Sequence, residues 1–247
     1  MISHAEQHGN VTLVAISDTG VSHRINHISN QDAVEYFVMD DDYMLAVSDG
    51  VGSCKKAEVG SKAAILAVKE VFILVKNKKI SEDITEITDN IIAKWHLLLK
   101  GEKPNECCAT LKAAMKLGSV ILLFSIGDGI LAISSAGMRI SSPVESNLFT
   151  NQTTCLNEIV SAENIWKSVF KLDTQVPYVV FACSDGVANG IQEGREMELI
   201  EEIENGTEAN ELQTELENLL MEISEYSSDD RTVGVVKYER KNAKFNR

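Results

Sequence analysis

Acidic residues recur beside glycine where apolar runs of this 247-residue chain end. Three such pairs, each just behind an apolar run, are Asp49-Gly50, Asp128-Gly129 and Asp185-Gly186. A further acidic pair, Asp229-Asp230, comes shortly before the apolar residues 232–236. One Asp-Gly pair alone is commonly just a turn. Carboxylates at several strand ends, however, can meet and build one shared, oxygen-rich site.

Such a site suits hard divalent cations, because Mg²⁺ and Mn²⁺ prefer carboxylate, carbonyl and water oxygens. An Asp-Gly pair offers a carboxylate, and a carbonyl that can approach an ion closely because glycine has no side chain. Two ions about 3.5–4 Å apart can share a water, lower its pKa and bind a phosphate for in-line attack. No protein nucleophile is then needed, and the chain has no convincing Ser-His-Asp, GxSxG or P-loop pattern.

Composition limits the remaining function classes. Hydrophobic residues make up 44% and charged residues 24% of the chain, which predicts a sizeable core. The net charge of -14 argues against binding to nucleic acid or to anionic membranes. No apolar run approaches the ~18 residues of a membrane span, and the start of the chain does not resemble a signal peptide. The five scattered cysteines lack a CxxC pair and predict reduced thiols. We therefore expect a cytoplasmic protein.

Hydrophobic periodicity predicts the elements that would position the acidic pairs. Strands are expected at residues 11–17, 33–39, 43–48, 107–115, 119–126, 130–134, 178–183 and 232–238. Helices are expected at residues 55–76, at 81–99 with Ser81 as a cap, and over 193–224 with a break near Asn205-Gly206. Residues 21–32 are predicted to be a loop, and residues 141–165 are weakly patterned. We expect a single domain over residues 1–240 and a basic, disordered tail over 241–247.

The order of the motifs carries a resemblance to a known family. The segments are Asn30-Gln31-Asp32-Ala33, residues 45–52 with Asp49-Gly50, Cys108-Ala109-Thr110-Leu111, Gly127-Asp128-Gly129, Ser184-Asp185-Gly186-Val187 and Asp229-Asp230-Arg231-Thr232-Val233. Over residues 14–236 the chain resembles the metal-dependent (type 2C, PPM) Ser/Thr protein phosphatases. It is similar to a bacterial branch, whose Gly-x-Ser-His and later Gln-Asp match Gly20-Val21-Ser22-His23 and Gln31-Asp32.

The resemblance implies a fold, a reaction and a set of metal-binding residues. The fold is α/β (α+β), a central antiparallel β-sandwich flanked by helices in four layers, αββα. The reaction is hydrolysis of phosphoserine or phosphothreonine by a water activated between two Mn²⁺ or Mg²⁺ ions, with a weaker third ion in some members. The implied metal residues are Asp49 as the bridge, the Gly50 carbonyl, Asp185 and Asp229 on the first metal, Asp32 beside the second through water, and Asp128 for the third ion.

The chain departs from the family pattern where phosphate is bound. The family's phosphate-binding Arg lies five residues before the Asp of the early loop, where this chain has His27. Arg24 or His23 is expected to take that role beside the catalytic Asp49, although His23 could instead only order the loop. Gln31 stands where many members have Glu, which removes one acidic group near the metals.

The expected partners are a phosphoprotein substrate and a cognate Ser/Thr kinase in a signalling pathway, with no nucleic acid and no membrane. Two alternatives stay open. One is a pseudophosphatase that binds phosphoproteins without turnover, which Gln31 and the missing Arg favour and the retained Asp49, Asp185 and Asp229 oppose. The other is a phosphatase of small phosphorylated metabolites, since a two-metal site alone does not specify a protein substrate.

Overall fold

Two antiparallel sheets form the centre of the computed structural model, which describes residues 1–143, 154–173, 175–192 and 194–240. Within these residues, the first sheet has the strand order β1 (Ile2–His8), β2 (Val11–Asp18), β11 (Arg231–Tyr238), β10 (Tyr178–Cys183), β7 (Ile130–Ser135) and β8 (Met138–Ser141). The second sheet has the order β3 (Asp32–Met39), β4 (Asp42–Asp49), β5 (Leu111–Leu117), β6 (Val120–Ile126) and β9 (Trp166–Lys171).

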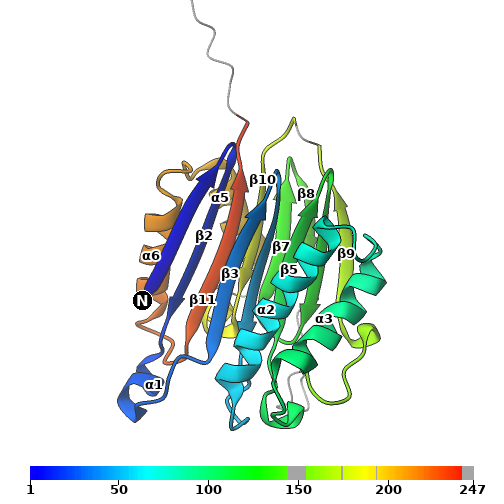
Figure 1. The fold of residues 1–247 in the computed structure, drawn as a ribbon. Helices are drawn as coiled ribbons and strands as arrows, with labels where there is room; N and C mark the ends of the chain where they lie inside the picture. Colours follow the sequence, from blue (N-terminus) through cyan, green and yellow to red (C-terminus); the bar gives the residue numbers. More distant parts are fainter. Residues whose placement is uncertain (144–153, 174, 193, 241–247) are drawn as a thin grey trace, which may run out of the picture.

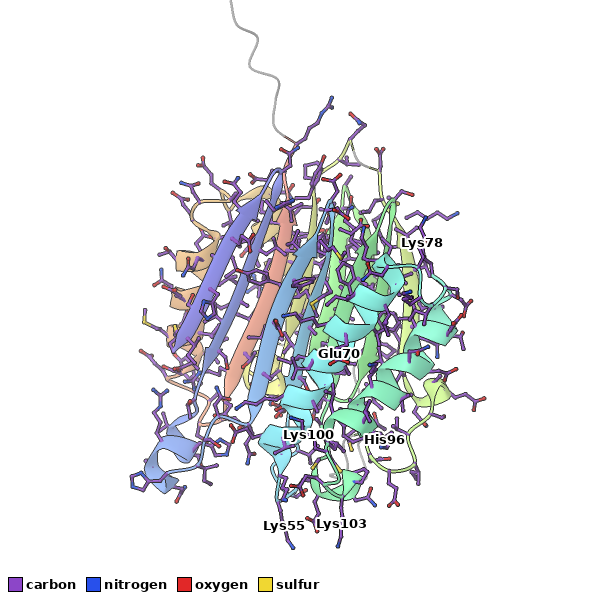
Figure 2. All side chains as sticks on the ribbon, viewed as in Figure 1. Lys55, Glu70, Lys78, His96, Lys100 and Lys103 are labelled. Atoms are coloured by element: carbon purple, nitrogen blue, oxygen red, sulfur yellow. The ribbon has the colours of Figure 1, made fainter. Side chains whose placement is uncertain are left out.

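Helices cover the outer face of each sheet (Figure 1). The helices α2 (Ala57–Lys76) and α3 (Ile84–Leu98) pack on the sheet that contains β3 and β4, and Figure 2 shows Glu70 and His96 on their outer sides. The helices α5 (Glu196–Asn205) and α6 (Leu212–Ile223) cover the other sheet. Shorter elements are α1 (Val21–Asn26), α4 (Asp185–Ala188) and the 3-10 turns η1 (Pro104–Glu106) and η2 (Ala162–Asn164). The four-layer αββα sandwich implied by the resemblance is therefore confirmed.

The hydrophobic core has three layers. One lies between the two sheets, and each of the other two lies between a sheet and the pair of helices that covers it. Leu45 and Leu123 lie between the sheets, Phe72 and Trp95 lie under the first pair of helices, and Phe181 lies under the second. Because both faces of the central strands are covered, β4 and β10 are buried almost throughout. This explains why they have continuous apolar runs instead of an alternating pattern.

Strand pairing brings the acidic motifs to one end of the sandwich. Asp49, the last residue of β4, pairs with Asp32, the first residue of β3. In the other sheet, Asp18 at the end of β2 pairs with Arg231 at the start of β11. Asp185 follows β10 directly through Ser184. The acidic motifs thus meet at the lower end of the molecule in Figure 1, where α1 lies.

Most predicted elements are present, with shifts at their ends and several additions. The structure adds β1, β8 and β9, and α1 occupies part of the predicted loop 21–32. Residues 107–110 precede β5 and are not part of that strand. The cap of α3 is Asp83, which accepts hydrogen bonds from two backbone amides, and not Ser81 as predicted. The tail 241–247 and residues 144–153 of the weakly patterned region lie outside the described residues. Among the described helices, none is long and apolar enough to cross a membrane.

Candidate metal centre

A small cavity of about 150 Å³ opens at the end of the sandwich where the acidic motifs meet. Its described lining comes from loops at the ends of both sheets: His23, Gln31, Asp49, Gly50, Val51, Gly52, Thr110, Asp128, Asp185, Asp229 and Asp230. The cavity therefore contains most residues of the predicted site, although they come from segments far apart in the sequence.

Three carboxylates in this cavity lie close enough to share a cation. Asp49, Asp128 and Asp185 each offer an oxygen, and these oxygens all lie within 4.8 Å of one another. Asp49 ends β4, Asp128 lies in the turn between β6 and β7, and Asp185 begins α4. Asp229 also lines the cavity, one residue before Asp230. An all-oxygen set of this kind fits Mg²⁺ or Mn²⁺.

Asp32 lies beside Asp49 on the neighbouring strand and is not among the residues that line the cavity. Its side chain contacts Asp49, Ser184 and Thr232, and it is almost completely buried. The buried Oδ2 atom of Asp32 has no hydrogen-bond partner among the described residues. An orphaned carboxylate oxygen next to a metal-like cluster fits a group that would contact a bound ion indirectly, as the resemblance implies for Asp32.

Burial, with repulsion between neighbouring carboxylates, raises the pKa values of these acids. Burial raises the pKa of Asp32 to about 7. Burial, together with the charges of Asp32 and Asp185, raises the pKa of Asp49 well above its usual range. Burial, together with the charges of Asp128 and Asp229, raises the pKa of Asp185 to about 6. Acids held in this way lose protons readily only when a cation is close, so the cluster is electrostatically suited to a divalent ion.

Gly50 allows the loop after β4 to pass close to α2. A Cβ atom at position 50 would lie 2.5 Å from the carbonyl oxygen of Ala57, the first residue of α2. The Gly50 amide donates to the carbonyl of Gln31 at 3.1 Å. Glycine at this position is therefore required by a close approach of two backbones. Gly50 lines the cavity, and the use of its carbonyl as a metal ligand stays a prediction.

Asp230 organises the loop that carries His23. Its carboxylate accepts hydrogen bonds from the backbone amides of Gly20 and Gln31, each at 2.7 Å, and lies 2.9 Å from Nδ1 of His23. Gly20 itself is closely packed, because a Cβ there would lie 2.4 Å from the Ser228 carbonyl oxygen. With Nδ1 bound to Asp230, the imidazole of His23 has a fixed orientation at the edge of the cavity.

A family model described as "Protein phosphatase 2C" matches residues 19–221. The chain belongs to the protein phosphatase 2C family. No curated protein matches the chain in sequence. This match confirms the predicted resemblance to the type 2C (PPM) phosphatase family, and the solved structures that the chain resembles share its fold.

Several solved structures share the fold at low sequence identity. A serine/threonine phosphatase of S. agalactiae is 15% identical, with 93% of this chain and 100% of that chain covered and a TM-score of 0.67. The catalytic domain of the phosphatase PstP, in complex with 2 manganese ions, is 17% identical, with 93% and 99% covered and a TM-score of 0.63. RsbX, in complex with magnesium, is 15% identical, with 96% and 100% covered and a TM-score of 0.60.

Arg24 of this phosphatase 2C protein has a different position from His23. Its side chain is about half exposed, and Nη2 donates to Oδ2 of Asp18 at 2.9 Å. The same Asp18 oxygen accepts from the fully buried Arg231 at 2.6 Å. The ion pairs with Arg231 and Arg24 help to hold the pKa of Asp18 below its ordinary value against the effect of burial. The described contacts thus tie Arg24 to Asp18, whereas His23 faces the cavity.

Two residues beside the cavity had no role in the sequence prediction: Lys112, which it did not single out, and Thr110, which it gave only as part of a family motif. Lys112 is buried within β5, and its Nζ donates to the carbonyl of Gly127 at 2.6 Å and to Ser125. It thereby supports the turn that carries Asp128. The hydroxyl of Thr110 accepts from the amide of Asp49 at 3.0 Å. A lysine inside an apolar strand was the available signal for Lys112, because lysine is rarely buried without a partner.

Proposed function

We propose that this chain is a metal-dependent protein serine/threonine phosphatase. The observation that carries the proposal is the set of carboxylate oxygens of Asp49, Asp128 and Asp185 within 4.8 Å of one another, in a chain of the protein phosphatase 2C family. Divalent ions bound there, Mn²⁺ or Mg²⁺, would supply an activated water and neutralise the phosphoryl oxygens. We propose two ions and a weaker third.

Each carboxylate has a separate proposed role in holding these ions. Asp49 would be the central ligand shared by both ions, and the Gly50 carbonyl would bind one of them. Asp185 and Asp229 would complete the first ion's ligand set, and Asp128 would contribute to the weaker third site. Asp32, which contacts Asp49, would lie beside the second ion and act on it mainly through bound water. This arrangement would place the phosphate group of the substrate in the cavity that these residues line.

We propose that His23 contacts the substrate's phosphate or leaving oxygen. Asp230 binds its Nδ1, so Nε2 is the ring atom left to face the cavity. When protonated, Nε2 can donate a hydrogen bond to a phosphoryl oxygen, or pass its proton to the oxygen of the serine or threonine that leaves. Arg24 is the weaker candidate, because it would first have to leave Asp18.

The proposed substrate is a phosphoprotein, opposed by a cognate Ser/Thr kinase in the cytoplasm, and residues 1–240 would act as a single domain. Family membership supports a protein substrate over a small metabolite. The retained carboxylates support turnover over the pseudophosphatase alternative, since a binding module would not need so many converging, partly buried acids in one place.

Phosphate release from a panel of substrates tests the proposal. Purified protein with Mn²⁺ would be given phosphoserine and phosphothreonine peptides, p-nitrophenyl phosphate, sugar phosphates and nucleotides. The proposal predicts metal-dependent release from the peptides and from p-nitrophenyl phosphate, with lower kcat/KM on the metabolites. Preferred hydrolysis of a metabolite would move the function to the metabolite class. If no substrate of the panel were hydrolysed, the pseudophosphatase would be the remaining alternative.

A further inference from the structure

Three of the five cysteines gather beside the candidate metal centre, although they are scattered in the sequence. Cys54 lies in the loop after β4, Cys108 lies just before β5, and Cys155 lies next to Leu156, which pairs with Ala109. The Sγ atoms of Cys54 and Cys108 both donate to the carbonyl oxygen of Asn105, each at 3.5 Å. All three thiols are partly exposed, whereas Cys107 and Cys183 are buried.

The thiols of this cluster, Cys54, Cys108 and Cys155, interact with one another. Burial raises the pKa of Cys108, and hydrogen bonding with Cys54 and with Cys155 raises it further. The three lie at the end of the molecule where the loops 50–56 and 99–106 are adjacent, since the Lys56 amide donates to the Glu106 carbonyl at 2.8 Å. Figure 2 shows Lys55 and Lys103 extending from these two loops at that end. The cluster is therefore reachable from solvent.

A soft metal ion is the less favoured occupant of this cluster. Tetrahedral zinc needs four converging ligands. Among the described residues, the group whose ligand atoms all converge within 4.8 Å is the carboxylate set of Asp49, Asp128 and Asp185, and the cysteines do not form a second one. Cys54 and Cys108 instead meet as a pair at the Asn105 carbonyl oxygen, which favours a bond between these two sulfurs.

We propose that Cys54 and Cys108 form a reversible oxidation site, in which a hydroperoxide such as hydrogen peroxide converts the two thiols to a disulfide. In the first step a sulfur lone pair of deprotonated Cys54 attacks one peroxide oxygen. The O–O bond breaks, the leaving hydroxide takes a proton to become water, and Cys54 becomes a sulfenic acid.

In the second step the sulfur of Cys108 attacks the Cys54 sulfenic sulfur. The S–S bond forms as the S–O bond breaks, and the Cys108 proton leaves with the departing hydroxide as a second water. Two electrons pass from the thiols to the peroxide, which is fully reduced to water. The raised pKa of Cys108 disfavours its thiolate, so Cys54 is assigned the first attack. Cys155 is a second partner that can exchange into the bond.

Backbone hydrogen bonds connect this site to the metal-binding loop. The amide of Val51 donates to the carbonyl of Cys108 at 2.9 Å, and the amide of Cys54 donates to the carbonyl of Val51 at 2.8 Å. Gly50 forms a bridge with Ala109, the residue after Cys108. A disulfide needs sulfurs at about 2.05 Å and a restricted dihedral angle. Closing it would therefore pull residues 51–54 and shift the Gly50 carbonyl in the cavity.

Peptide mapping of the folded full-length protein tests the proposal directly and does not depend on phosphatase activity. The protein is treated with a small excess of hydrogen peroxide, alkylated while still folded, digested with trypsin and analysed by mass spectrometry. The expected product joins residues 25–55 to residues 101–112. Fragmentation between Cys107 and Cys108, which share one tryptic peptide, identifies the bonded sulfur. Cys107 and Cys183 should be recovered unoxidised.

Matched variants separate the proposal from general oxidation. Cys54→Ser should abolish the cross-link and leave Cys108 reduced or joined to Cys155, whereas Cys155→Ser should retain the Cys54–Cys108 bond. Peroxide should lower the Mn²⁺-dependent rate of wild type, dithiothreitol should restore it, and Cys54→Ser should resist the loss. Recovery of Cys54, Cys108 and Cys155 all alkylated, or oxidation of single cysteines without a Cys54–Cys108 bond, would overturn the proposal. Peroxide-resistant binding of zinc with loss of these thiols' reactivity would overturn it in favour of a metal site.

Discussion

The Nδ1 atom of His23 lies 2.9 Å from Oδ2 of Asp230, the residue directly after the candidate metal ligand Asp229. The same Asp230 carboxylate accepts from the amides of Gly20 and Gln31. One side chain therefore closes the loop 20–31 and orients the histidine that faces the cavity. This hydrogen bond, together with the peptide link between Asp230 and Asp229, ties the position of the histidine to that of the candidate metal ligand.

Replacing His23 should reduce catalysis without unfolding the protein. In His23→Gln we expect kcat to fall about 10²-fold, since a positioned acid–base group commonly contributes at least that much. The exposed His27, in the same loop with a left-handed φ of 55°, is the matched control. Because Asn tolerates that conformation, His27→Asn should keep wild-type kcat. Steady-state kinetics with thermal melts check both variants, and equal rates for His23→Gln and wild type would exclude the role proposed for His23.

Removing metal should make stability depend on pH near neutrality. Burial and mutual repulsion raise the pKa values of Asp32 to about 7 and of Asp185 to about 6, above the ordinary 3.8. The folded state then holds protons that the unfolded chain has already lost. The contribution of these two groups to the stability of the folded state is therefore greatest below about pH 4. It decreases as the pH rises and is lost once the pH has passed through 6 to 7. We expect the Tm of metal-free protein to fall between pH 5 and pH 8.

Mn²⁺ should reverse this loss, because a ligand that binds only the folded state stabilises it. The increase in Tm on adding Mn²⁺ should be larger at pH 8 than at pH 5. In Asp185→Asn the pH dependence of the metal-free protein should be weaker. Thermal melts with EDTA and with Mn²⁺ measure the Tm of the metal-free protein, the increase on adding Mn²⁺ and the pH dependence of the variant. A Tm of metal-free wild type that rises from pH 5 to pH 8 would contradict the electrostatic account.

Gly50→Ala should damage both stability and activity. The added Cβ would lie 2.5 Å from the Ala57 carbonyl oxygen, so the loop or α2 must move. We expect a loss of about 1–3 kcal/mol, and a Tm lower by roughly 2–4 °C for each kcal/mol. Gly52→Ala is the control, because the nearest atom to its Cβ would be Gln31 Oε1 at 3.8 Å. Equal behaviour of the two variants would show that the close approach at Gly50 is unimportant.

Asp128 and Asp185 should differ in their dependence on metal concentration. Asp185→Asn removes a ligand of the central site and should abolish turnover at every Mn²⁺ concentration. Asp128→Asn should raise the Mn²⁺ concentration for half-maximal rate by about 10-fold, as expected for a weaker or indirect ligand. Titration of the rate with Mn²⁺ tests this. Identical titrations for Asp128→Asn and wild type would remove Asp128 from the proposed ligands.

The sandwich could be predicted from sequence because its central strands have clear signals. The strand predicted at residues 178–183 has the same bounds as β10. The pairing of β3 with β4 follows from the short acidic turn between them. The edge strands β1, β8 and β9 have mixed exposed residues and no apolar run, so no local pattern indicates them. They exist because a neighbouring strand offers free backbone groups, which is a tertiary effect.

The site could be predicted in its composition but only partly in its arrangement. Asp49 and Asp185 were found because a strand end and a glycine mark each of them. The burial of Asp32 beside Asp49 and the contact between Arg24 and Asp18 depend on strand register and loop path, which single residues do not reveal. The cluster of Cys54, Cys108 and Cys155 has the same origin. Its members come from separate segments and share no spacing rule.

The initial rate of phosphate release from a phosphothreonine peptide, measured against Mn²⁺ concentration for wild type and Asp49→Asn, tests the central claim most directly. Asp49 belongs to the carboxylate cluster and also contacts Asp32, and Asn keeps its size but removes its charge. We predict a rate that saturates with Mn²⁺ in wild type and is absent with EDTA. The Asp49→Asn protein should remain folded and release phosphate at the background rate. Equal Mn²⁺-dependent rates for the two proteins, or no rate above background for wild type, would contradict the account.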